Sequence, residues 1–213
     1  VVGLGARPNS ALAAAAGVPV GPSGGILVDD HLRTRVAHVW AVGDCVESLH
    51  RVSRRGVNIA LGTHANKQGR AAGTNLGGGD AAFLGVLGTA ITRVGDAEVA
   101  RTGLNEREAA DAGFEVVTAT HTASSRAHYY PGSSDVTVKL VAERGTGRLL
   151  GGQIVGGEGA GKRIDVIATA LWNEMTVEEL GGIDLAYAPP FSPVWDPVLL
   201  AAGRTAMAVD RAG

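Results

Sequence analysis

The chain has 213 residues, of which 45% are hydrophobic, and this is enough for one large domain or two small domains with their own cores. Its 19 basic and 21 acidic side chains give a net charge of −2, which argues against nucleic acid or an anionic membrane as a partner. The apolar runs are shorter than the roughly 18 residues that a spanning helix needs, and no signal segment precedes them, so we expect a soluble, cytoplasmic protein.

Short apolar segments alternate with Gly and Pro turns in the first third of the chain. We expect strands at residues 1–5, 24–30 and 38–44, followed by a helix within residues 58–76. Strands that are buried on both faces and followed by helices are typical of α/β structure. The chain starts in such a strand and without Met, so we expect it to be the C-terminal part of a longer protein.

The pattern changes in the rest of the chain to the alternation of an antiparallel sheet. Residues 88–103 predict a half-exposed strand pair, residues 114–123 predict a further strand, and residues 135–156 predict a hairpin with a Gly-containing turn. We therefore expect two domains, 1–84 and 85–213, the second an α+β domain with helices on one face of its sheet.

Two capping boxes predict helix starts in this second domain. Asn105 is followed three residues later by Glu108, and Thr176 is followed by Glu179 in the same way. Gly113 would end the first of these helices. Between the two boxes, apolar residues recur at spacings of three and four, which predicts one apolar helical stripe. Its members are Ile164, Ile167, Ala168, Leu171, Trp172 and Met175.

The strand predicted at residues 38–44 ends in Gly43 and Asp44. By itself, Gly-Asp after a strand is a turn signal. At the carboxyl end of a strand in an open sheet, however, Gly lets a ligand approach the backbone, and an ionised Asp accepts a strong hydrogen bond from a sugar-alcohol hydroxyl. Thr34 completes the pattern T-x-x-x-x-V-W-A-V-G-D, and this context favours a ligand site.

This pattern resembles the second FAD signature of the FAD-dependent pyridine nucleotide-disulfide oxidoreductases, T-x4-h-[FYW]-A-x-G-D. In that family the Asp holds the ribityl chain of the flavin, so the resemblance implies this role for Asp44. It also implies that Asn58, Ile59 and Ala60 lie beside the flavin ring at the start of the next helix. The unpaired N–H groups of a helix N-terminus would stabilise a reduced flavin. The alternative for this helix is simple packing.

The resemblance extends over essentially the whole chain and implies its architecture. Residues 1–9 are similar to the segment that leaves the NAD(P)H domain of the family and re-enters the FAD domain. Residues 1–84 would then be the α/β remnant of a Rossmann-like FAD-binding domain. Residues 85–213 would be an α+β interface (dimerisation) domain with an antiparallel sheet, through which the protein forms a homodimer.

The segment 184–198, DLAYAPPFSPVWDPV, holds four prolines, which forbid a regular helix or a central strand and make the segment stiff. In other disulfide reductases of the family, the equivalent segment carries a His-Pro-Thr and a Glu that reach into the partner subunit's active site. Here no His follows His128, and Tyr187 takes that position. The segment is therefore similar to the single-cysteine branch, and most similar to coenzyme A-disulfide reductases, in which interface-domain tyrosines assist a cysteine of the other chain.

Tyr129 and Tyr130 in RAHYYPG fit the same branch. A phenol has an ordinary pKa of about 10, so at neutral pH it can protonate a leaving thiolate without carrying charge itself. The catalytic candidates are therefore Tyr187 and one of Tyr129 and Tyr130. The alternative is that all three are ordinary core or interface aromatics.

Three other features suggest chemistry that their residues do not support. Residues 156–163, GGEGAGKR, nearly match a phosphate-binding loop, but Arg163 stands where a Ser or Thr would ligate magnesium. Cys45 is the only cysteine, so no intramolecular disulfide is possible, and we expect a small buried side chain rather than a nucleophile. His121 and His128 lack the spacing of shared metal ligands, and we expect no metal site.

The resemblance implies an incomplete flavoenzyme subunit. In the intact family, NAD(P)H reduces FAD, and a cysteine then reduces a small-molecule disulfide such as CoA disulfide, or a persulfide. The NAD(P)H site and the catalytic cysteine would lie outside this chain, so we expect the chain alone to be inactive. The alternatives are an NADH oxidase or peroxidase of the same branch and, from another class, a cofactor-free dimerisation module.

Overall fold

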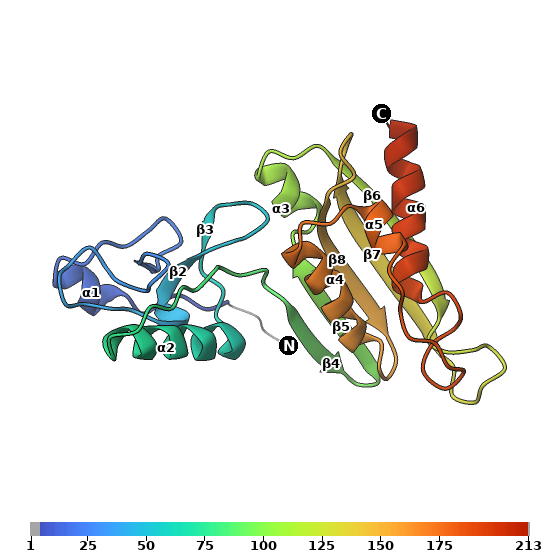
Figure 1. Ribbon diagram of the computed structural model, residues 1–213, viewed down its shortest axis with the longest axis horizontal. Coiled ribbons are helices and arrows are strands. Elements are labelled where there is room, and N and C mark those ends of the chain that lie inside the picture. The colour runs from blue at the N-terminus through green and yellow to red at the C-terminus, as the bar shows by residue number, and fades with distance from the viewer. Residues whose placement is uncertain (1–4, 213) are drawn as a thin grey trace. The chain divides into compact units, whose positions relative to one another are not determined.

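The structure is a computed structural model that describes residues 5–212. It divides into an N-terminal unit that ends at Gly88 and a C-terminal unit that begins at Thr89. Figure 1 shows the helices and strands of both units. Most of the strand predicted at residues 1–5 lies outside the described residues. In the described part of the chain, no helix has both the length and the apolar character that crossing a bilayer requires.

The N-terminal unit contains a small three-stranded sheet and two helices. The strands are β1 (Ile26–Leu27), β2 (Val46–Leu49) and β3 (Gly56–Val57), and the helices are α1 (Ala11–Ala15) and α2 (Gly62–Leu76). The central strand β2 pairs in parallel with β1 and antiparallel with β3. The predicted α2 is confirmed, and the mixture of a parallel strand pair with helices fits the predicted α/β class.

The strand predicted at residues 38–44 is wrong in its position. Within the described residues, this segment makes only one bridge, from Trp40 to Arg33, and Gly43–Cys45 forms a single 3-10 turn, η1. The chain becomes a strand after this turn, as β2. A run of apolar residues indicates that a segment is buried, but it does not show that a neighbouring strand is present to pair with it. In addition, Gly43, with φ +81°, turns the backbone out of the extended conformation.

The C-terminal unit is built on a five-stranded sheet in the order β4-β5-β8-β7-β6, with every neighbouring pair antiparallel. The predicted antiparallel sheet is thus confirmed. The strands are β4 (Ala90–Val94), β5 (Ala97–Gly103), β6 (Val116–Ser124), β7 (Asp135–Glu143) and β8 (Leu149–Gly156). The helices are α3 (Glu106–Asp111), α4 (Ile164–Trp172), α5 (Val177–Gly181) and α6 (Pro197–Ala212), and α4 follows the short turn η2 (Gly161–Arg163).

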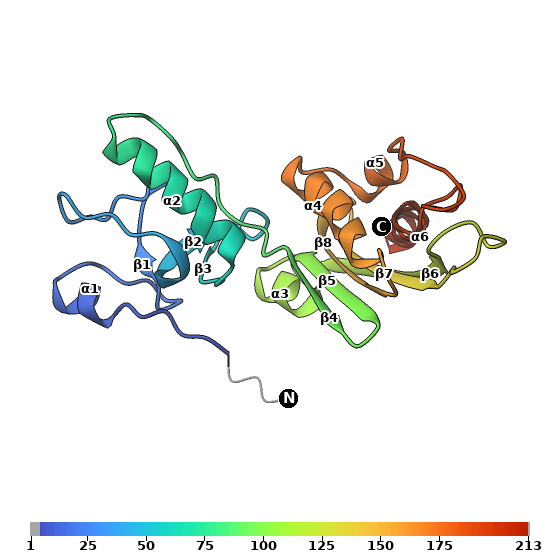
Figure 2. The same cartoon turned by 90° about the horizontal axis from the view of Figure 1, so that it is seen from below.

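One face of this sheet is the core of the unit. Val136, Val138 and Leu140 alternate along β7 and are fully buried, as is Ile154 on β8. Helix α4 packs on β5 and β8, and α6 packs on β6 and β7, so that α4, α5 and α6 lie on the same side of the sheet (Figure 2). Each fully buried aliphatic side chain of this size contributes about 1.5–3 kcal/mol to folding.

The two predicted capping boxes are confirmed. In each, the side chain of Asn105 or Thr176 accepts a hydrogen bond from the backbone of the Glu three residues later, and that Glu bonds back to the cap. The stripe in α4 is partly wrong. The helix ends at Trp172, which is 40% exposed, and Glu174, with φ +56°, turns the chain before Met175. Helical spacing therefore does not continue to Met175, and Ala170 is buried instead.

Two glycines allow β5 and β8 to approach closely where they end. Gly103, with φ +65°, pairs with Gly151. A Cβ added at Gly151 would lie 2.0 Å from the carbonyl oxygen of Leu104, which is backbone and cannot rotate away. No side chain larger than hydrogen fits at Gly151.

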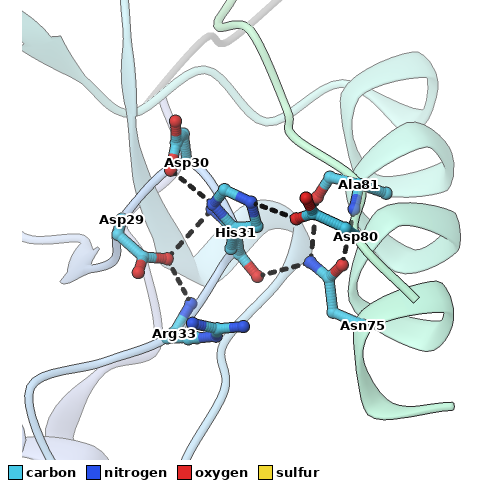
Figure 3. A network of polar contacts seen from close by, with 7 residues as sticks. All are labelled: Asp29, Asp30, His31, Arg33, Asn75, Asp80 and Ala81. Atoms are coloured by element: carbon cyan, nitrogen blue, oxygen red, sulfur yellow. Dashed lines mark hydrogen bonds and ion pairs between the residues drawn. The ribbon is translucent and has the colours of Figure 1, made fainter. Parts of the chain in front are cut away.

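A polar network fixes the segment that follows α2 (Figure 3). The Nδ1 atom of His31 lies 2.6 Å from the Asp30 carboxylate, and its Nε2 atom lies 2.8 Å from that of Asp80. Asn75, at the end of α2, donates to the carbonyls of His31 and Ala81 and accepts from the Ala81 N–H. The hydrogen bond to Asp30, followed by that to Asp80, raises the pKa of His31 above its ordinary 6.5.

We predict that Gly151→Ala destabilises the chain by about 1–3 kcal/mol, because the backbone of two strands must move apart. Gly203→Ala in α6 is the matched control. A Cβ there meets nothing within 4 Å, and the loss of a helical glycine should stabilise by about 0.5–1 kcal/mol. Urea unfolding measures both changes. Equal free energies of unfolding for the Gly151 variant and the parent would contradict the close approach.

We predict that His31→Gln removes a pH-dependent part of the stability. Because the folded pKa of His31 is raised, its stabilising contribution is complete below the unfolded pKa of about 6.5 and is lost as pH rises through the folded pKa. The difference in free energy of unfolding between parent and variant should therefore shrink from pH 6 to pH 9. Urea denaturation at each pH measures this difference. Asp80→Asn should reduce the same difference. Parallel pH profiles would rule out the paired imidazolium.

Candidate functional site

Gly43 and Asp44 lie in η1, the turn that leads into β2. The left-handed conformation of Gly43, with φ +81°, is one that glycine adopts without strain. Asp44 is exposed, and within residues 5–212 no hydrogen bond to its carboxylate occurs. The turn therefore presents an ionised acceptor on a backbone that carries no side chain at the preceding residue.

The turn is held in place by Gln68, a residue that the sequence patterns did not select. Its Oε1 atom accepts from the Gly43 N–H at 2.6 Å, and its Nε2 atom donates to the Ser48 hydroxyl at 2.9 Å. Gln68 is 1% exposed, on the buried face of α2 that also carries Ala71, Ala72 and Asn75. The sequence signal that could have identified Gln68 is its spacing of three and four residues from Ala71 and Ala72, which places a polar side chain on the apolar face of the helix.

Asn58 joins the same turn from the other side. Its Nδ2 atom donates to the carbonyl of Asp44 at 2.8 Å and to that of Val46 at 2.9 Å. The structure thus brings Asn58 next to Asp44, but residues 58–60 precede α2 and are not its first residues, which corrects the predicted helix start. The two bonds hold Asn58 in an irregular segment, and the helix begins only after Leu61, whose φ is −134°.

His64, in the first turn of α2, is a second residue that the sequence patterns did not select. Its Nδ1 atom lies 3.3 Å from the Ile59 carbonyl. Partial burial is the largest influence on its pKa, which is lowered from the ordinary 6.5, while the charge of Asp44 acts in the opposite direction. The imidazole is therefore mostly neutral at pH 7.

The donors and acceptors of these residues match those that a flavin cofactor needs. An exposed carboxylate suits a polyol chain, since it accepts hydrogen bonds from hydroxyls. The N-terminus of α2 has no side-chain cap, so its first N–H groups offer donors and positive potential to an anionic ring. Both requirements are met within one segment of the N-terminal unit, and the residues fit the group.

Tyr129 and Tyr187 form a second constellation, in the C-terminal unit. Tyr129 lies in the loop between β6 and β7, and Tyr187 lies between α5 and α6, in a segment without helix or strand, as its prolines predict. The two phenols are close enough for Tyr129 to act on the pKa of Tyr187. Partial burial, followed by the neighbouring Tyr129, raises the pKa of Tyr187 above its ordinary 10.0. Tyr187 is therefore protonated at neutral pH.

The structure distinguishes between the two adjacent tyrosines. Tyr129 raises the pKa of Tyr187, whereas Tyr130 is half-buried and does not contribute to that shift. A backbone bond from the N–H of Ala127 to the carbonyl of Pro189, at 3.2 Å, links the two loops directly. The pairing of residues 129 and 187, so distant in sequence, depends on this tertiary contact.

Cys45 and His31 have surroundings that fit structural roles. Cys45 is half-buried, packs against the cluster of Val18, Ile26, Ala41 and Val46, and lies 3.4 Å from the Val42 carbonyl. Among the described residues, Asp29, Asp30 and His31 are a group whose side-chain atoms lie near enough to share a metal ion. Both ring nitrogens of His31 are already engaged by carboxylates, from Asp30 and Asp80.

Two family models match the chain. The model described as the pyridine nucleotide-disulphide oxidoreductase dimerisation domain matches residues 89–197. The model described as pyridine nucleotide-disulphide oxidoreductase matches residues 1–69. The two matches fall in the C-terminal and the N-terminal unit respectively.

Individual relatives agree with this assignment. The chain is 43% identical over 202 residues to the NAD(P)H coenzyme A polysulfide/persulfide reductase of Pyrococcus horikoshii, covering 95% of this chain and 45% of that protein. It is 37% identical, with the same coverage, to an NADH oxidase of Methanocaldococcus jannaschii. The solved NAD-dependent persulfide reductase from A. fulgidus superposes with a TM-score of 0.93 at 44% identity, over 97% of this chain and 38% of that one. The chain spans about half the length of the curated relatives it matches.

Proposed function

The chain belongs to the pyridine nucleotide-disulphide oxidoreductase family, and from this premise we propose that it forms the C-terminal part of an FAD- and NAD(P)H-dependent enzyme that reduces a thiol-based substrate. CoA disulfide and CoA persulfide are the substrates that we favour. The observation that carries the proposal is the contact between Tyr129 and Tyr187. Two phenols would then stand where the family resemblance gives other branches a histidine.

The names of the relatives support a coenzyme A persulfide as substrate, since the Pyrococcus relative is named for it. The NADH oxidase from Methanocaldococcus favours a second candidate, in which oxygen takes the place of the thiol substrate. The tyrosine pair favours the thiol, because a phenol that stays protonated at neutral pH is suited to donate a proton to a leaving thiolate. The chain's NAD(P)H site and catalytic cysteine would belong to the remaining length of the protein.

In the N-terminal unit, Asp44 would hold the ribityl hydroxyls of FAD, and Gly43 would let the cofactor approach the backbone. Asn58, Ile59, Ala60 and the N-terminus of α2 would face the ring. When bound, FAD supplies the redox centre that takes electrons from NAD(P)H and passes them on as a pair. Gln68 keeps the turn in shape, and the neutral His64 adds no competing positive charge beside Asp44.

In the C-terminal unit, the phenol of Tyr187 would donate its proton to the sulfur that leaves when the S–S bond of the substrate is reduced. Tyr129, its neighbour, would orient that phenol. Two large apolar side chains in the Pro-rich segment of Tyr187 are exposed. The exposed fraction is 78% for Phe191 and 62% for Trp195. A second subunit covering this segment would bury them, which supports a homodimer through the dimerisation domain.

We predict that Asp44→Ala weakens FAD binding by about 10- to 100-fold, the cost of losing a charge-assisted hydrogen bond. The chain is incubated with FAD and desalted, and the retained flavin is measured by its visible absorption; if the chain alone retains too little, affinity is measured in the full-length protein. Asp96→Ala is the control, because it removes a fully exposed carboxylate in the C-terminal unit. Equal flavin retention by both variants would contradict the role of Asp44.

We predict that Tyr187→Phe lowers kcat for NAD(P)H-dependent reduction of CoA disulfide by the full-length protein by about 100-fold, with little change in KM, because a proton donor is lost but not a binding surface. Tyr129→Phe should cause a larger loss than Tyr130→Phe, since Tyr129 contacts Tyr187. If Tyr187→Phe keeps the parent kcat for CoA disulfide reduction, and the protein rapidly consumes oxygen when NADH is supplied, the NADH oxidase hypothesis replaces the thiol reductase hypothesis.

A further inference from the structure

Arg163 lies at the end of η2 and its guanidinium is the point at which several loops meet. Its Nη2 atom donates to the carbonyl of Ser125 at 2.6 Å and to that of Phe191 at 3.0 Å. Its Nη1 atom donates to the carbonyl of Gly159 at 3.2 Å. The arginine that removes the phosphate-loop interpretation of residues 156–163 thus has an extensive set of partners of its own.

Asp196 anchors this guanidinium. The Nε atom of Arg163 lies 3.0 Å from Oδ2 of Asp196, and the two side chains are only 13% and 12% exposed. The Oδ2 atom also accepts from the Ser192 hydroxyl, and Oδ1 accepts from the N–H of Val198 in the first turn of α6. Both carboxylate oxygens of Asp196 and all three guanidinium nitrogens of Arg163 are therefore hydrogen-bonded, which offsets the cost of burying the two charges.

Two of the carbonyls that Arg163 holds belong to the loops that carry the tyrosine pair. Ser125 starts the loop of Tyr129, and backbone and side-chain bonds between Ser125 and Ser134 close the base of that loop. Phe191 lies in the Pro-rich segment, four residues after Tyr187. The guanidinium of Arg163 is thus hydrogen-bonded to both loops near their tyrosines. The bond from the Ala127 N–H to the Pro189 carbonyl is a second, direct link between the loops.

We propose that Arg163 is a positioning residue, which holds the two loops together from its anchor on Asp196 and so brings Tyr129 and Tyr187 into contact. The importance of that contact for catalysis rests on the proposed function, but the positioning itself does not. The geometry requires arginine, because the planar fork directs N–H groups to several acceptors at once, whereas a lysine ammonium is a point charge on a flexible stem. Arg163 touches neither reacting atoms nor cofactor in this role.

The competing explanation is that the pair only stabilises the fold. Breaking a buried ion pair by removing one partner costs about 3–5 kcal/mol, because the other charge is left uncompensated. Loss of stability in an Arg163 variant would therefore be expected under both explanations. The state of the tyrosine pair, in contrast, changes only if Arg163 positions the loops.

The test measures the titration of Tyr187 in the folded chain, labelled with ¹³C at the tyrosine ring carbon that bears the hydroxyl. The chain has only three tyrosines, so Tyr→Phe variants assign each NMR signal. In Arg163→Met, the pKa of Tyr187 should fall toward its ordinary 10.0, because separation of the two loops removes the partial burial of Tyr187 and then the neighbouring Tyr129, which together raise that pKa. Lys162→Met is the matched control. This adjacent cation is 76% exposed, and among the described residues its side chain pairs with Asp165 alone, so Tyr187 should titrate as in the parent.

Two further variants separate positioning from stability. Arg163→Lys keeps the positive charge near Asp196 but loses the fork, so Tyr187 should shift as in Arg163→Met while the chain stays folded. Arg163→Met combined with Asp196→Asn removes both charges and should recover stability, yet Ser125 and Phe191 remain without their donor, and Tyr187 should stay shifted. A parent-like titration of Tyr187 in folded Arg163→Lys, or its restoration together with stability in the double variant, would overturn the proposal.

These measurements need neither FAD nor substrate. Inactive full-length protein with an unchanged Arg163 effect would refute the proposed function and leave the positioning role intact. A parent-like Tyr187 in the Arg163 variants, with an active enzyme that depends on Tyr187, would refute the positioning role alone.

Discussion

The C-terminal unit depends on the register of β7 between β6 and β8. The alternation of Val136, Val138 and Leu140 admits only one face to the core, and a shift by one residue would turn these side chains away from α4 and α6. The register that results pairs Ser124 with Asp135 and Val136 with Gly156. It therefore brings the end of β6 and the end of β8 to the same edge of the sheet, on either side of the start of β7, which is why Arg163, shortly after β8, reaches the carbonyl of Ser125.

The N-terminal unit is organised differently, since its sheet is short and its cores are two small clusters. Buried or half-buried amides do much of the positioning there. Gln68 holds Gly43, Asn58 holds the carbonyl of Asp44, and Asn75 holds the segment after α2. Because a buried polar group must be paired, each amide fixes its partner in one place. The turn at Asp44 is consequently defined by hydrogen bonds more than by packing.

The two units offer complementary chemistry for the proposed enzyme. The N-terminal unit presents a carboxylate and an uncapped helix N-terminus, which suit a polyol and an anionic ring. The C-terminal unit presents the phenol of Tyr187 with that of Tyr129 as its neighbour, and a phenol suits proton donation at neutral pH. A cofactor-free dimerisation module would explain the second domain but would leave the geometry of Gly43 and Asp44 without a purpose.

The sequence by itself determined the features that depend on local chemistry. The capping boxes at Asn105 and Thr176, the hairpin of β7 and β8, and the absence of helix or strand around Tyr187 follow from side chains that act on nearby backbone. The family signature around Asp44 also lies in one short segment. Only the tertiary structure decided the rest: in the described part of the chain, residues 38–44 make a single bridge, from Trp40 to Arg33, in place of the predicted strand. Asn58 is held outside α2 by the carbonyls of Asp44 and Val46, and Gln68 acquires its role from Gly43. Tyr129, and not Tyr130, is the neighbour of Tyr187, and Arg163 is hydrogen-bonded to the Pro-rich segment. Both contacts join segments that are far apart in sequence, and no local pattern encodes which of two adjacent side chains will contact a third.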